Sequence, residues 1–485
     1  VVQWMADNPA LASYRFVVEN LYRQQQHVLD EAGERLLSLG TRFCGAPSEV
    51  YSALSTADMR FPEITLSDGQ RVVVSPGGYR LILSECREQR DRAAAFEVHY
   101  RCFQDKVNTY AALYNAIAQR DWYLAQSRNY GSTLDAALFG NNIPLTVVET
   151  LIETTRQGIA PLRRYHRLRR RALGLSRYHL YDGSVPLARV ERKYPYLEAL
   201  PAIVDSVAPL GPDYQARMRE ATRARWIDVY ENEGKRSGAY SAGVYGVHPY
   251  MLLNYNDTLD DVFTLAHELG HTLHTLLSHE SQPFCYASYT IFVAEVASTL
   301  NEALLLDHLL ERTEDPAERA VLLQRAIDNI CGTFYTQVLF ADWELQVHRK
   351  VEGGEPVTAI SLGELYLELL RAYYGDAAEI DELYAATWAR IPHFYGSPYY
   401  VYQYATCFAS SAHLLRGLRD DRQREGTVQR YLELLRAGSS DYPMALLQRA
   451  GVDLGRPETV EAVVDQLDGL VLRLEAELTA LGALD

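Results

Sequence analysis

The stretch Thr258–Leu277 decides how the chain is interpreted, and it reads T-L-D-D-V-F-T-L-A-H-E-L-G-H-T-L-H-T-L-L. It contains an H-E-x-x-H motif that begins at His267 and ends at His271. On a helix, residues four apart lie one turn above each other, so both imidazoles can reach one ion. Glu268 follows the first histidine and can act as a general base toward water at the metal rather than as a ligand. The motif therefore predicts a catalytic zinc site with one Zn²⁺ per chain.

The residues around the motif favour a helix. Thr258 is a good N-cap, and Asp260 and Asp261 follow in the first turn, where the helix dipole favours negative charge. Apolar residues then recur at helical spacing as far as Leu277. Gly270 is the misfit, because glycine inside a helix costs about 0.5–1 kcal/mol relative to alanine. A small residue between the two histidines predicts that another segment packs closely against the helix there.

The two histidines need a third ligand, which leaves a fourth position open, as in catalytic zinc sites. The continuation H-x-x-G-x-x-H is absent, because His274 stands where that pattern needs glycine. The third ligand must therefore come from elsewhere. The candidates are Glu280, Glu295 and Glu302.

The three glutamates differ in their surroundings. Glu280 lies in a polar stretch that is typical of a helix end and a loop. Glu295 lies in the apolar helical stretch Ile291–Leu306, which we expect to pack antiparallel on the first helix. A carboxylate should not be buried there unpaired, and coordination to zinc resolves that conflict. Glu302, seven residues on, suits a role in orienting a ligand histidine, with a structural salt bridge as the alternative.

Five blocks of the chain together resemble oligoendopeptidase F of the thimet oligopeptidase family. The blocks are 262–271 and 291–303, S-G-A-Y at 237–240, H-P-Y-M-L-L-N-Y-N at 248–256, and I-P-H-F-Y at 391–395 with Y-V-Y-Q-Y-A-T at 400–406. The resemblance covers nearly the whole chain. It implies a zinc endopeptidase, mainly α, with two helical halves around a deep channel that admits only short peptides. It also implies a helical segment that would precede Val1.

The predicted organisation has two parts. Residues 1–80 are expected to form a helical accessory region with a small hairpin at 64–74, where an Asp-Gly turn separates alternating residues. Residues 81–485 are expected to form the catalytic domain, with a zinc core at about 235–410. Residues 177–193 look like a linker before that core, since they contain Tyr-Asp-Gly and a proline.

The segment 239–256 predicts a strand pair with glycines at bends or points of close approach. An exposed strand edge beside the zinc helix could bind a peptide by strand addition, which holds substrates of varied sequence through main-chain hydrogen bonds. A purely structural hairpin is the alternative. The predicted substrate-contacting residues are Tyr240, Ala242, Gly243, His248, Tyr395, Tyr399 and Tyr400.

A Tyr-rich segment near residue 400 predicts donors for a developing oxyanion. Gly396-Ser397-Pro398 breaks the chain after His393, which indicates a loop. The resemblance implies that a histidine and a tyrosine on such a loop stabilise the oxyanion. It favours His393 and Tyr402, with Tyr399 and Tyr400 as rivals.

The composition argues against some classes of binding partner and bears on the location of the protein. Lys and Arg number 47 and Asp and Glu 63, so the net charge is 47 − 63 = −16, which argues against nucleic acid and anionic membranes. The six cysteines are scattered without a C-x-x-C pair, and no apolar run is long enough to span a membrane, so we expect reduced thiols and a cytoplasmic location. The basic run at 163–171 is interpreted as a solvated helix face rather than a patch for acidic partners. The sequence does not predict the oligomeric state.

The predicted function is hydrolysis of internal bonds in short, unstructured peptides. Two alternatives from other classes stay open. One is a zinc-bearing peptide-binding protein with little turnover, which the intact Glu268 disfavours. The other is a metalloaminopeptidase, which the absence of a G-x-M-E-N substrate-amine motif disfavours.

Overall fold

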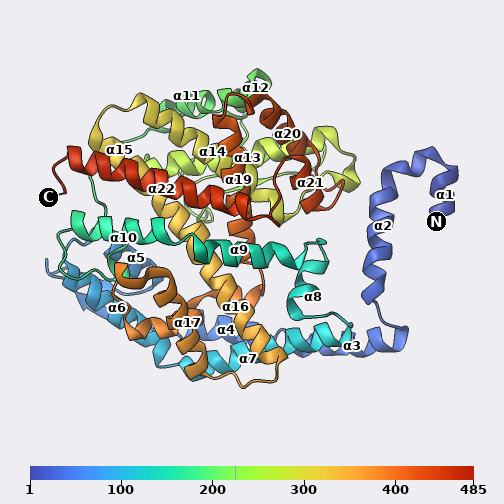
Figure 1. The fold of residues 1–485 in the computed structure, drawn as a ribbon, viewed down its shortest axis with the longest axis horizontal. Coiled ribbons are helices and arrows are strands. Elements are labelled where there is room, and N and C mark those ends of the chain that lie inside the picture. The colour runs from blue at the N-terminus through green and yellow to red at the C-terminus, as the bar shows by residue number, and fades with distance from the viewer. Residues whose placement is uncertain (224, 485) are drawn as a thin grey trace.

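Helices dominate the structure, a computed structural model that describes residues 1–223 and 225–484 (Figure 1). This mainly α architecture confirms the predicted fold class. Two groups of helices lie one above the other in Figure 1, with a few helices between them. The N-terminal helices α1 (Val2–Asp7), α2 (Arg15–Gln24) and α3 (Glu31–Cys44) extend along one side of the molecule.

The lower group comes from two parts of the chain. It contains α4 (Ala46–Ser52), α5 (Pro76–Glu85), α6 (Gln89–Gln104), α7 (Val107–Ser127) and α17 (Ala359–Tyr374). The helix α16 (Thr336–Glu352) runs into it from the other group and contacts both α7 and α19 (Tyr402–Arg419). The short helix α18 (Pro392–Gly396) contacts α4 and α7 and so belongs here. The helices α8 (Thr133–Phe139), α9 (Leu145–Gln157) and α10 (Ala160–Ala172) lie between the groups.

The upper group holds the H-E-x-x-H motif. Its helices are α11 (Tyr196–Ser206), α12 (Pro212–Arg223), α13 (Leu259–Ser281), α14 (Ile291–Arg312), α15 (Pro316–Ile330), α19 (Tyr402–Arg419), α20 (Arg424–Arg436), α21 (Pro443–Arg449) and α22 (Pro457–Ala480). The motif lies in α13, and Glu295 lies in α14.

The start of α13 follows from its sequence. The Thr258 hydroxyl accepts a hydrogen bond from the backbone N–H of Asp261, and the Asp261 carboxylate accepts one from the backbone N–H of Thr258. This capping box satisfies free donors of the first turn and confirms the predicted N-cap. Leu265, Leu269 and Leu273 are fully buried, and burial of each such side chain contributes about 1.5–3 kcal/mol.

Gly270 lies where α13 meets α14. A β-carbon at Gly270 would stand 2.6 Å from the Cα of Ser298 and 2.7 Å from the carbonyl oxygen of Ala297. The backbones of the two helices therefore touch at a point that only glycine permits, as the sequence predicted. This contact brings Glu295, one turn before Ser298, against the motif.

Two small sheets complete the fold. Strands β1 (Glu63–Thr65) and β2 (Arg71–Val73) form the predicted antiparallel hairpin. Strands β3 (Ile227–Asp228), β4 (Tyr240–Ala242) and β5 (Tyr250–Leu252) form a sheet in the order β3-β5-β4. The predicted strand pair is the antiparallel pair β4 and β5, with Tyr240 opposite Leu252. β4 lies at the edge of this sheet and contacts α13.

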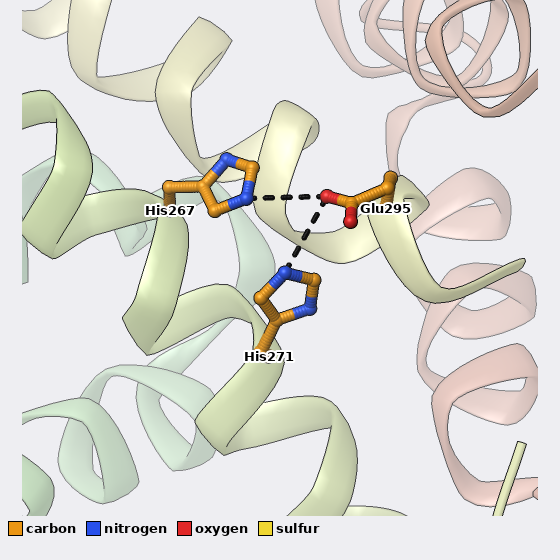
Figure 2. A group of neighbouring side chains, drawn as sticks. All are labelled: His267, His271 and Glu295. Atoms are coloured by element: carbon orange, nitrogen blue, oxygen red, sulfur yellow. Dashed lines mark ion pairs between the residues drawn. The ribbon is translucent and has the colours of Figure 1, made fainter. Parts of the chain in front are cut away.

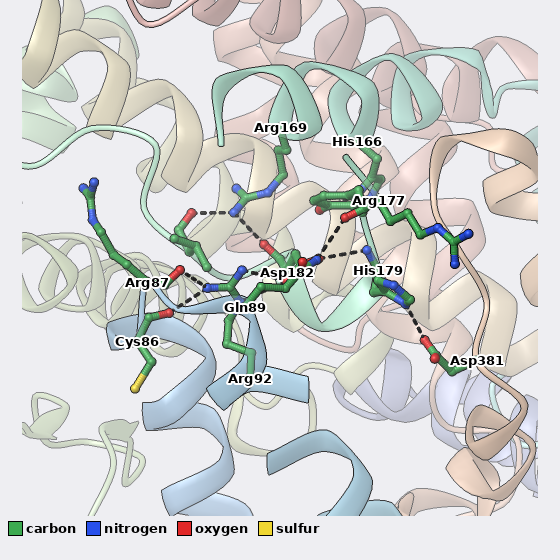
Figure 3. A network of polar contacts seen from close by, with 12 residues as sticks. Cys86, Arg87, Gln89, Arg92, His166, Arg169, Arg177, His179, Asp182 and Asp381 are labelled. Carbon is green, nitrogen blue, oxygen red and sulfur yellow. Dashed lines mark hydrogen bonds and ion pairs between the residues drawn. The ribbon is translucent and has the colours of Figure 1, made fainter. Parts of the chain in front are cut away.

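The predicted linker at 177–193 is anchored by a buried network (Figure 3). Asp182 is 0% exposed and accepts hydrogen bonds from Nε and NH2 of Arg92 in α6, at 3.0 and 2.8 Å. Its other oxygen accepts from Gln89 at 2.8 Å and from the backbone N–H of His179 at 2.9 Å. Removing one partner of such a buried pair typically costs about 3–5 kcal/mol. The segment that the sequence predicts as a linker is thus held in place by buried contacts.

The basic run lies in α10 and is used within the fold. Arg164 and Arg171 form ion pairs with Asp468 and Glu475, both in α22, at 2.5 and 2.7 Å. Arg169 is fully buried and donates to the hydroxyl of Tyr165 at 2.9 Å. The interpretation as a simple solvated face is therefore incomplete, because the run joins α10 to α22.

Among the helices that the structure describes, none combines the length and apolar character that crossing a membrane requires. All six cysteines, which lie within the described ranges, are free thiols.

Candidate metal centre

One carboxylate oxygen of Glu295 faces both motif histidines (Figure 2). Oε2 of Glu295 lies 3.1 Å from Nε2 of His267 and 3.4 Å from Nε2 of His271. The three residues offer ligand atoms that all lie within 4.8 Å of one another. Of the three candidate glutamates, Glu295 is thus the one whose carboxylate lies against both histidines.

The other two glutamates make different contacts. Glu280 is in the last turn of α13, which extends further than the sequence predicted, and its carboxylate pairs with Arg217 at 2.7 Å. Glu302 accepts a hydrogen bond from Nδ1 of His267 at 2.7 Å, whereas Glu295 lies at the other ring nitrogen, Nε2. This contact fixes the tautomer of the histidine so that Nε2 is free for a metal.

Arg325 contacts the carboxylate oxygen of Glu302 that does not bind His267. Its Nη1 lies 3.4 Å from Oε2 of Glu302, and its Nε donates to Asp260 at 2.7 Å. The guanidinium lies 3.9 Å from the centre of the Phe263 ring. A chain of contacts therefore runs from His267 through Glu302 to Arg325. Nothing in the local sequence around Arg325 marks it for this role.

The charges of the centre fit a cation. Burial raises the pKa of Glu295, but hydrogen bonds from His267 and His271 outweigh burial and hold it well below the ordinary value. Burial lowers the pKa of His267, but its bonds to Glu295 and Glu302 outweigh burial and raise it to about 10. The carboxylates thus demand positive charge at this position. Two imidazole nitrogens and one carboxylate oxygen form a donor set that suits zinc.

Glu268 lies beside this group and has no salt-bridge partner among the described residues. It is buried, and its Oε2 has no hydrogen-bond partner within the described ranges. Burial raises its pKa, while His267 and His271 act in the opposite direction. A buried carboxylate with a free oxygen and a raised pKa is suited to accept a proton.

His393 lies in the one-turn helix α18 rather than in a loop, because Pro392 starts a helical turn before the Gly-Ser-Pro break. Its Nε2 is 3.3 Å from the hydroxyl of Tyr404, and its ring stacks on that of Tyr400 with centroids 5.7 Å apart. Tyr400 and Tyr404 meet edge to face at 5.3 Å. Burial, Tyr404 and the charge of Glu295 raise the pKa of Tyr400 to about 12.

The structure does not bring Tyr402 into this cluster. Its side chain is buried at the start of α19, and its ring faces Phe292 at 6.2 Å. Tyr395 is fully buried and stacks on Tyr51 at 3.8 Å, and Tyr399 is buried with its hydroxyl 2.7 Å from Thr133 Oγ1. Contact of Tyr395 or Tyr399 with a peptide, and an oxyanion role for Tyr402, are therefore not supported by these positions. Tyr404 is the neighbour of His393 that sequence reasoning missed.

The remaining predicted substrate residues lie at the edge strand. Tyr240 and Ala242 of β4 and Gly243 just after it are exposed. A β-carbon at Gly243 would stand 2.4 Å from Cγ2 of Thr275, so the chain crosses α13 there in close contact. His248 is half-buried and stacks on Trp226 at 4.4 Å.

Tyr289 also lies near the metal centre, although the sequence did not single it out. Its hydroxyl is 2.9 Å from Thr275 Oγ1, and burial together with the charges of Glu295 and Glu268 raises its pKa to about 12. Its ring stacks on that of His274 at 3.6 Å. His274 is thus a packing residue of α13 rather than a fourth ligand.

Known protein families match most of the chain. The profile of peptidase family M3 matches residues 82–465, and the profile described as Oligopeptidase F matches residues 1–61.

Individual relatives agree with the family match. The Oligopeptidase PepF of Bacillus subtilis is 37% identical over 98% of this chain and 71% of its own length. An oligoendopeptidase F homolog of Lactococcus lactis is 35% identical over 98% of this chain and 78% of its own. The crystal structure of oligoendopeptidase-F from Enterococcus faecium superposes with a TM-score of 0.81 at 30% identity, over 99% of this chain and 80% of that one.

Proposed function

Because this chain belongs to peptidase family M3 and is an oligopeptide-cleaving metallopeptidase, we propose that its metal is one zinc ion held by His267, His271 and Glu295. The observation that carries this proposal is the single Glu295 oxygen that faces both imidazoles at 3.1 and 3.4 Å. Zinc bound there supplies Lewis acidity, which acidifies water and polarises a peptide carbonyl.

Glu268 is the proposed general base. Its buried carboxylate accepts a proton from the attacking water and returns it to the leaving amine. The raised pKa supports this exchange, because a base whose pKa lies nearer the working pH can also act as the acid. The free Oε2 is the atom that holds the proton between the two steps.

The proposed oxyanion donors are His393 and Tyr400, with Tyr404 holding His393. Tyr400 takes this role instead of Tyr402, since it is half-exposed and senses the charge of Glu295. The hydroxyl of Tyr404 fixes the Nε2 side of the His393 ring. Donors aimed at the carbonyl oxygen gain strength as negative charge develops there, and one such donor is typically worth about 10²–10³ in rate.

The proposed peptide site runs along β4. This strand is at a sheet edge and carries the exposed Tyr240 and Ala242, so an extended peptide can add to it next to α13. Main-chain pairing is blind to side chains, which favours peptides of varied sequence. The six free thiols favour a cytoplasmic location, where thiols stay reduced.

The test separates the base from the ligands. We expect Glu268→Gln to keep its zinc and its helical content but to lose at least about 10³-fold in kcat, because an amide cannot take a proton. We expect Glu295→Ala to lose most of its zinc. Metal content is measured by mass spectrometry, and turnover is measured on an internally cleaved chromogenic peptide whose N-terminus is blocked.

Glu280→Ala is the matched control, since Glu280 lies on the same helix as the histidines but pairs with Arg217. It should keep both zinc and activity. Loss of zinc from Glu268→Gln would contradict its role as base. Cleavage that requires a free N-terminus would favour an aminopeptidase, and zinc binding without turnover in the parent protein would favour a peptide-binding protein.

A further inference from the structure

Tyr399, the residue before Tyr400, has an unusual backbone. Its φ is +56°, in the left-handed region that a bulky aromatic side chain rarely adopts. Such a conformation persists only where the surrounding structure holds it. Because Tyr400 follows directly, the turn at Tyr399 sets the direction in which the Tyr400 side chain leaves the backbone.

The side chain of Tyr399 is held at two points. Its hydroxyl lies 2.7 Å from Thr133 Oγ1, and Thr133 in turn donates to Glu352 at 2.7 Å. Its ring lies against that of His348, with centroids 4.6 Å apart. Both Glu352 and His348 belong to α16, so this helix holds the side chain of Tyr399 in place.

A third residue of α16, Glu344, lies next to the backbone of Tyr399. Glu344 is 1% exposed, and the backbone N–H of Tyr399 lowers the pKa of its carboxyl group against the effect of burial. Glu344 precedes His348 by one helical turn, and the Glu344 carbonyl lies 2.9 Å from Nδ1 of His348. The other ring nitrogen of His348, Nε2, lies 3.2 Å from Oδ2 of Asp121 in α7.

A carboxyl group in this place needs an explanation. Burial raises the pKa of Glu344 to about 7, although His348 and the Tyr399 backbone act against this shift. Its Oε1 has no hydrogen-bond partner among the described residues. No part of the proposed chemistry uses Glu344, and an apolar residue would be less costly in the same volume.

We propose that Glu344 is a positioning residue that holds the left-handed turn at Tyr399 and thereby directs the hydroxyl of Tyr400 toward the reacting carbonyl. This inference rests on the role of Tyr400 proposed above. The consequence is that a side chain of α16, which contacts both helix groups, controls the proposed oxyanion donors. Glu344 does not touch substrate and acts only through Tyr399.

A double-mutant cycle tests the proposal on the zinc-loaded full chain. Glu344→Met removes the acceptor but keeps the volume, and we expect it to lower kcat about 10-fold with KM nearly unchanged, since a displaced donor loses part of the 10²–10³ effect. Glu344→Gln keeps an acceptor oxygen and should restore kcat to within about threefold of the parent. In a Tyr400→Phe background the Glu344→Met change should lower kcat by less than about twofold, because the hydroxyl it positions is gone.

Asp342→Asn is the matched control. Asp342 is a buried carboxylate two residues earlier in α16, but it pairs with Arg156 at 2.7 Å and does not face the turn. It should lower the melting temperature without changing kcat. If Glu344→Met does not fold, as judged by circular dichroism and zinc content, Thr133→Val carries the test, since it removes the hydrogen bond that holds the Tyr399 hydroxyl.

The outcomes separate the two proposals. If Tyr400→Phe leaves kcat unchanged, the role of Tyr400 fails, and this inference fails with it. If Tyr400→Phe lowers kcat but the effect of Glu344→Met, or of Thr133→Val in its place, is the same in both backgrounds, Tyr400 keeps its role and the positioning by Glu344 is overturned. Equal loss of kcat in Asp342→Asn would also overturn it, because α16 would then act only through general stability.

Discussion

Glu295 shows at the scale of one residue how burial and charge select a function. Its carboxylate is half-buried among apolar side chains of α14, and the energetic cost of leaving a charge there unpaired would be several kcal/mol. Two imidazoles compensate that charge in the structure, and they are neutral metal ligands when deprotonated. Binding of the proposed zinc ion would therefore replace protons at a position that already requires positive charge.

Two histidines outside the metal centre predict acid sensitivity. Burial lowers the pKa of His99 to about 4 and that of His166 to about 3, so both stay neutral in the fold. In the unfolded chain a histidine binds a proton below about pH 6.5. The stabilisation that these residues provide is thus fully present above pH 6.5 and is lost as the pH falls toward 4, by about 1.4 kcal/mol per pH unit for each residue.

His99→Gln isolates one of these residues, because glutamine binds no proton in either state. The parent should be more stable than the variant at pH 7, since His99 contacts the Val74 carbonyl and stacks on Tyr79. The difference in urea midpoint should then shrink as the pH is lowered from 6.5 to 4. Parallel midpoint curves would show that His99 takes up its proton equally in both states. Zinc release affects both proteins alike and cancels in the comparison.

The site residues that the sequence could predict are those with a spacing rule. His267, His271 and Glu268 follow from the helix repeat, and Glu302 meets His267 as the sequence suggested. The Tyr-rich block had no such rule, because its helical start was not known. With α19 beginning at Tyr402, the side chain of Tyr402 is buried in the core, whereas the ring of Tyr404 meets that of Tyr400, which lies just before the helix.

At the scale of an element, the pairing of α13 and α14 decides whether the ligands meet. The helices touch at Gly270, where a β-carbon would stand 2.6 Å from backbone. Backbone cannot rotate away as a side chain can, so any larger residue must push the helices apart. Glu295 lies one turn from this contact and would move away from His267 and His271.

Gly270→Ala should therefore lower both stability and zinc affinity, although alanine is the better helix former by about 1 kcal/mol. We expect the melting temperature to fall by several degrees, corresponding to an overpacking cost of about 1–3 kcal/mol. Zinc affinity, measured by competition with a chelator, should fall at least about 10-fold.

Gly469→Ala provides the contrast. Gly469 lies in the middle of α22, is exposed, and has no atom within 4 Å of an added β-carbon. Here the propensity of alanine should raise the melting temperature and leave zinc affinity unchanged. If both substitutions raise the melting temperature, the close approach at Gly270 does not control the pairing of α13 and α14.

Elements were predicted where local signals agree and missed where long-range contacts decide. The capping box at Thr258 and the Asp-Gly hairpin are local, and both are present. The anchoring of residues 177–193 depends on Arg92, about ninety positions away, so no pattern near Asp182 reveals it. The buried Glu344 and His348 were likewise hidden in a helical stretch without a motif.

At the scale of the whole molecule, the proposed active groups come from two helix groups. The proposed zinc ligands and base lie on α13 and α14 in the upper group, whereas His393 lies on α18, which contacts α4 and α7 in the lower group. Tyr400 lies on the connection between α18 and α19. A carbonyl that meets both sets of residues must lie between the groups, beside the edge strand β4. The enclosed channel that the family resemblance implies at this place remains a prediction.

We therefore predict that the size and folding state of the substrate limit cleavage. An extended peptide spans about 3.3 Å per residue, and peptides of up to about two dozen residues should enter and be cut at internal bonds. A folded protein has no free extended segment to pair with β4, and a long denatured chain must thread between the helix groups at a high entropic cost.

The test compares the cleavage rates of blocked peptides of graded length, from about 6 to 40 residues, with the rate on denatured casein at equal bond concentration. The rate should fall steeply beyond about two dozen residues. Digestion of casein at a rate comparable to that of a short peptide would contradict an enclosed site and would leave the zinc chemistry intact, because Glu268 and the ligands act on the bond whatever the length of chain that carries it.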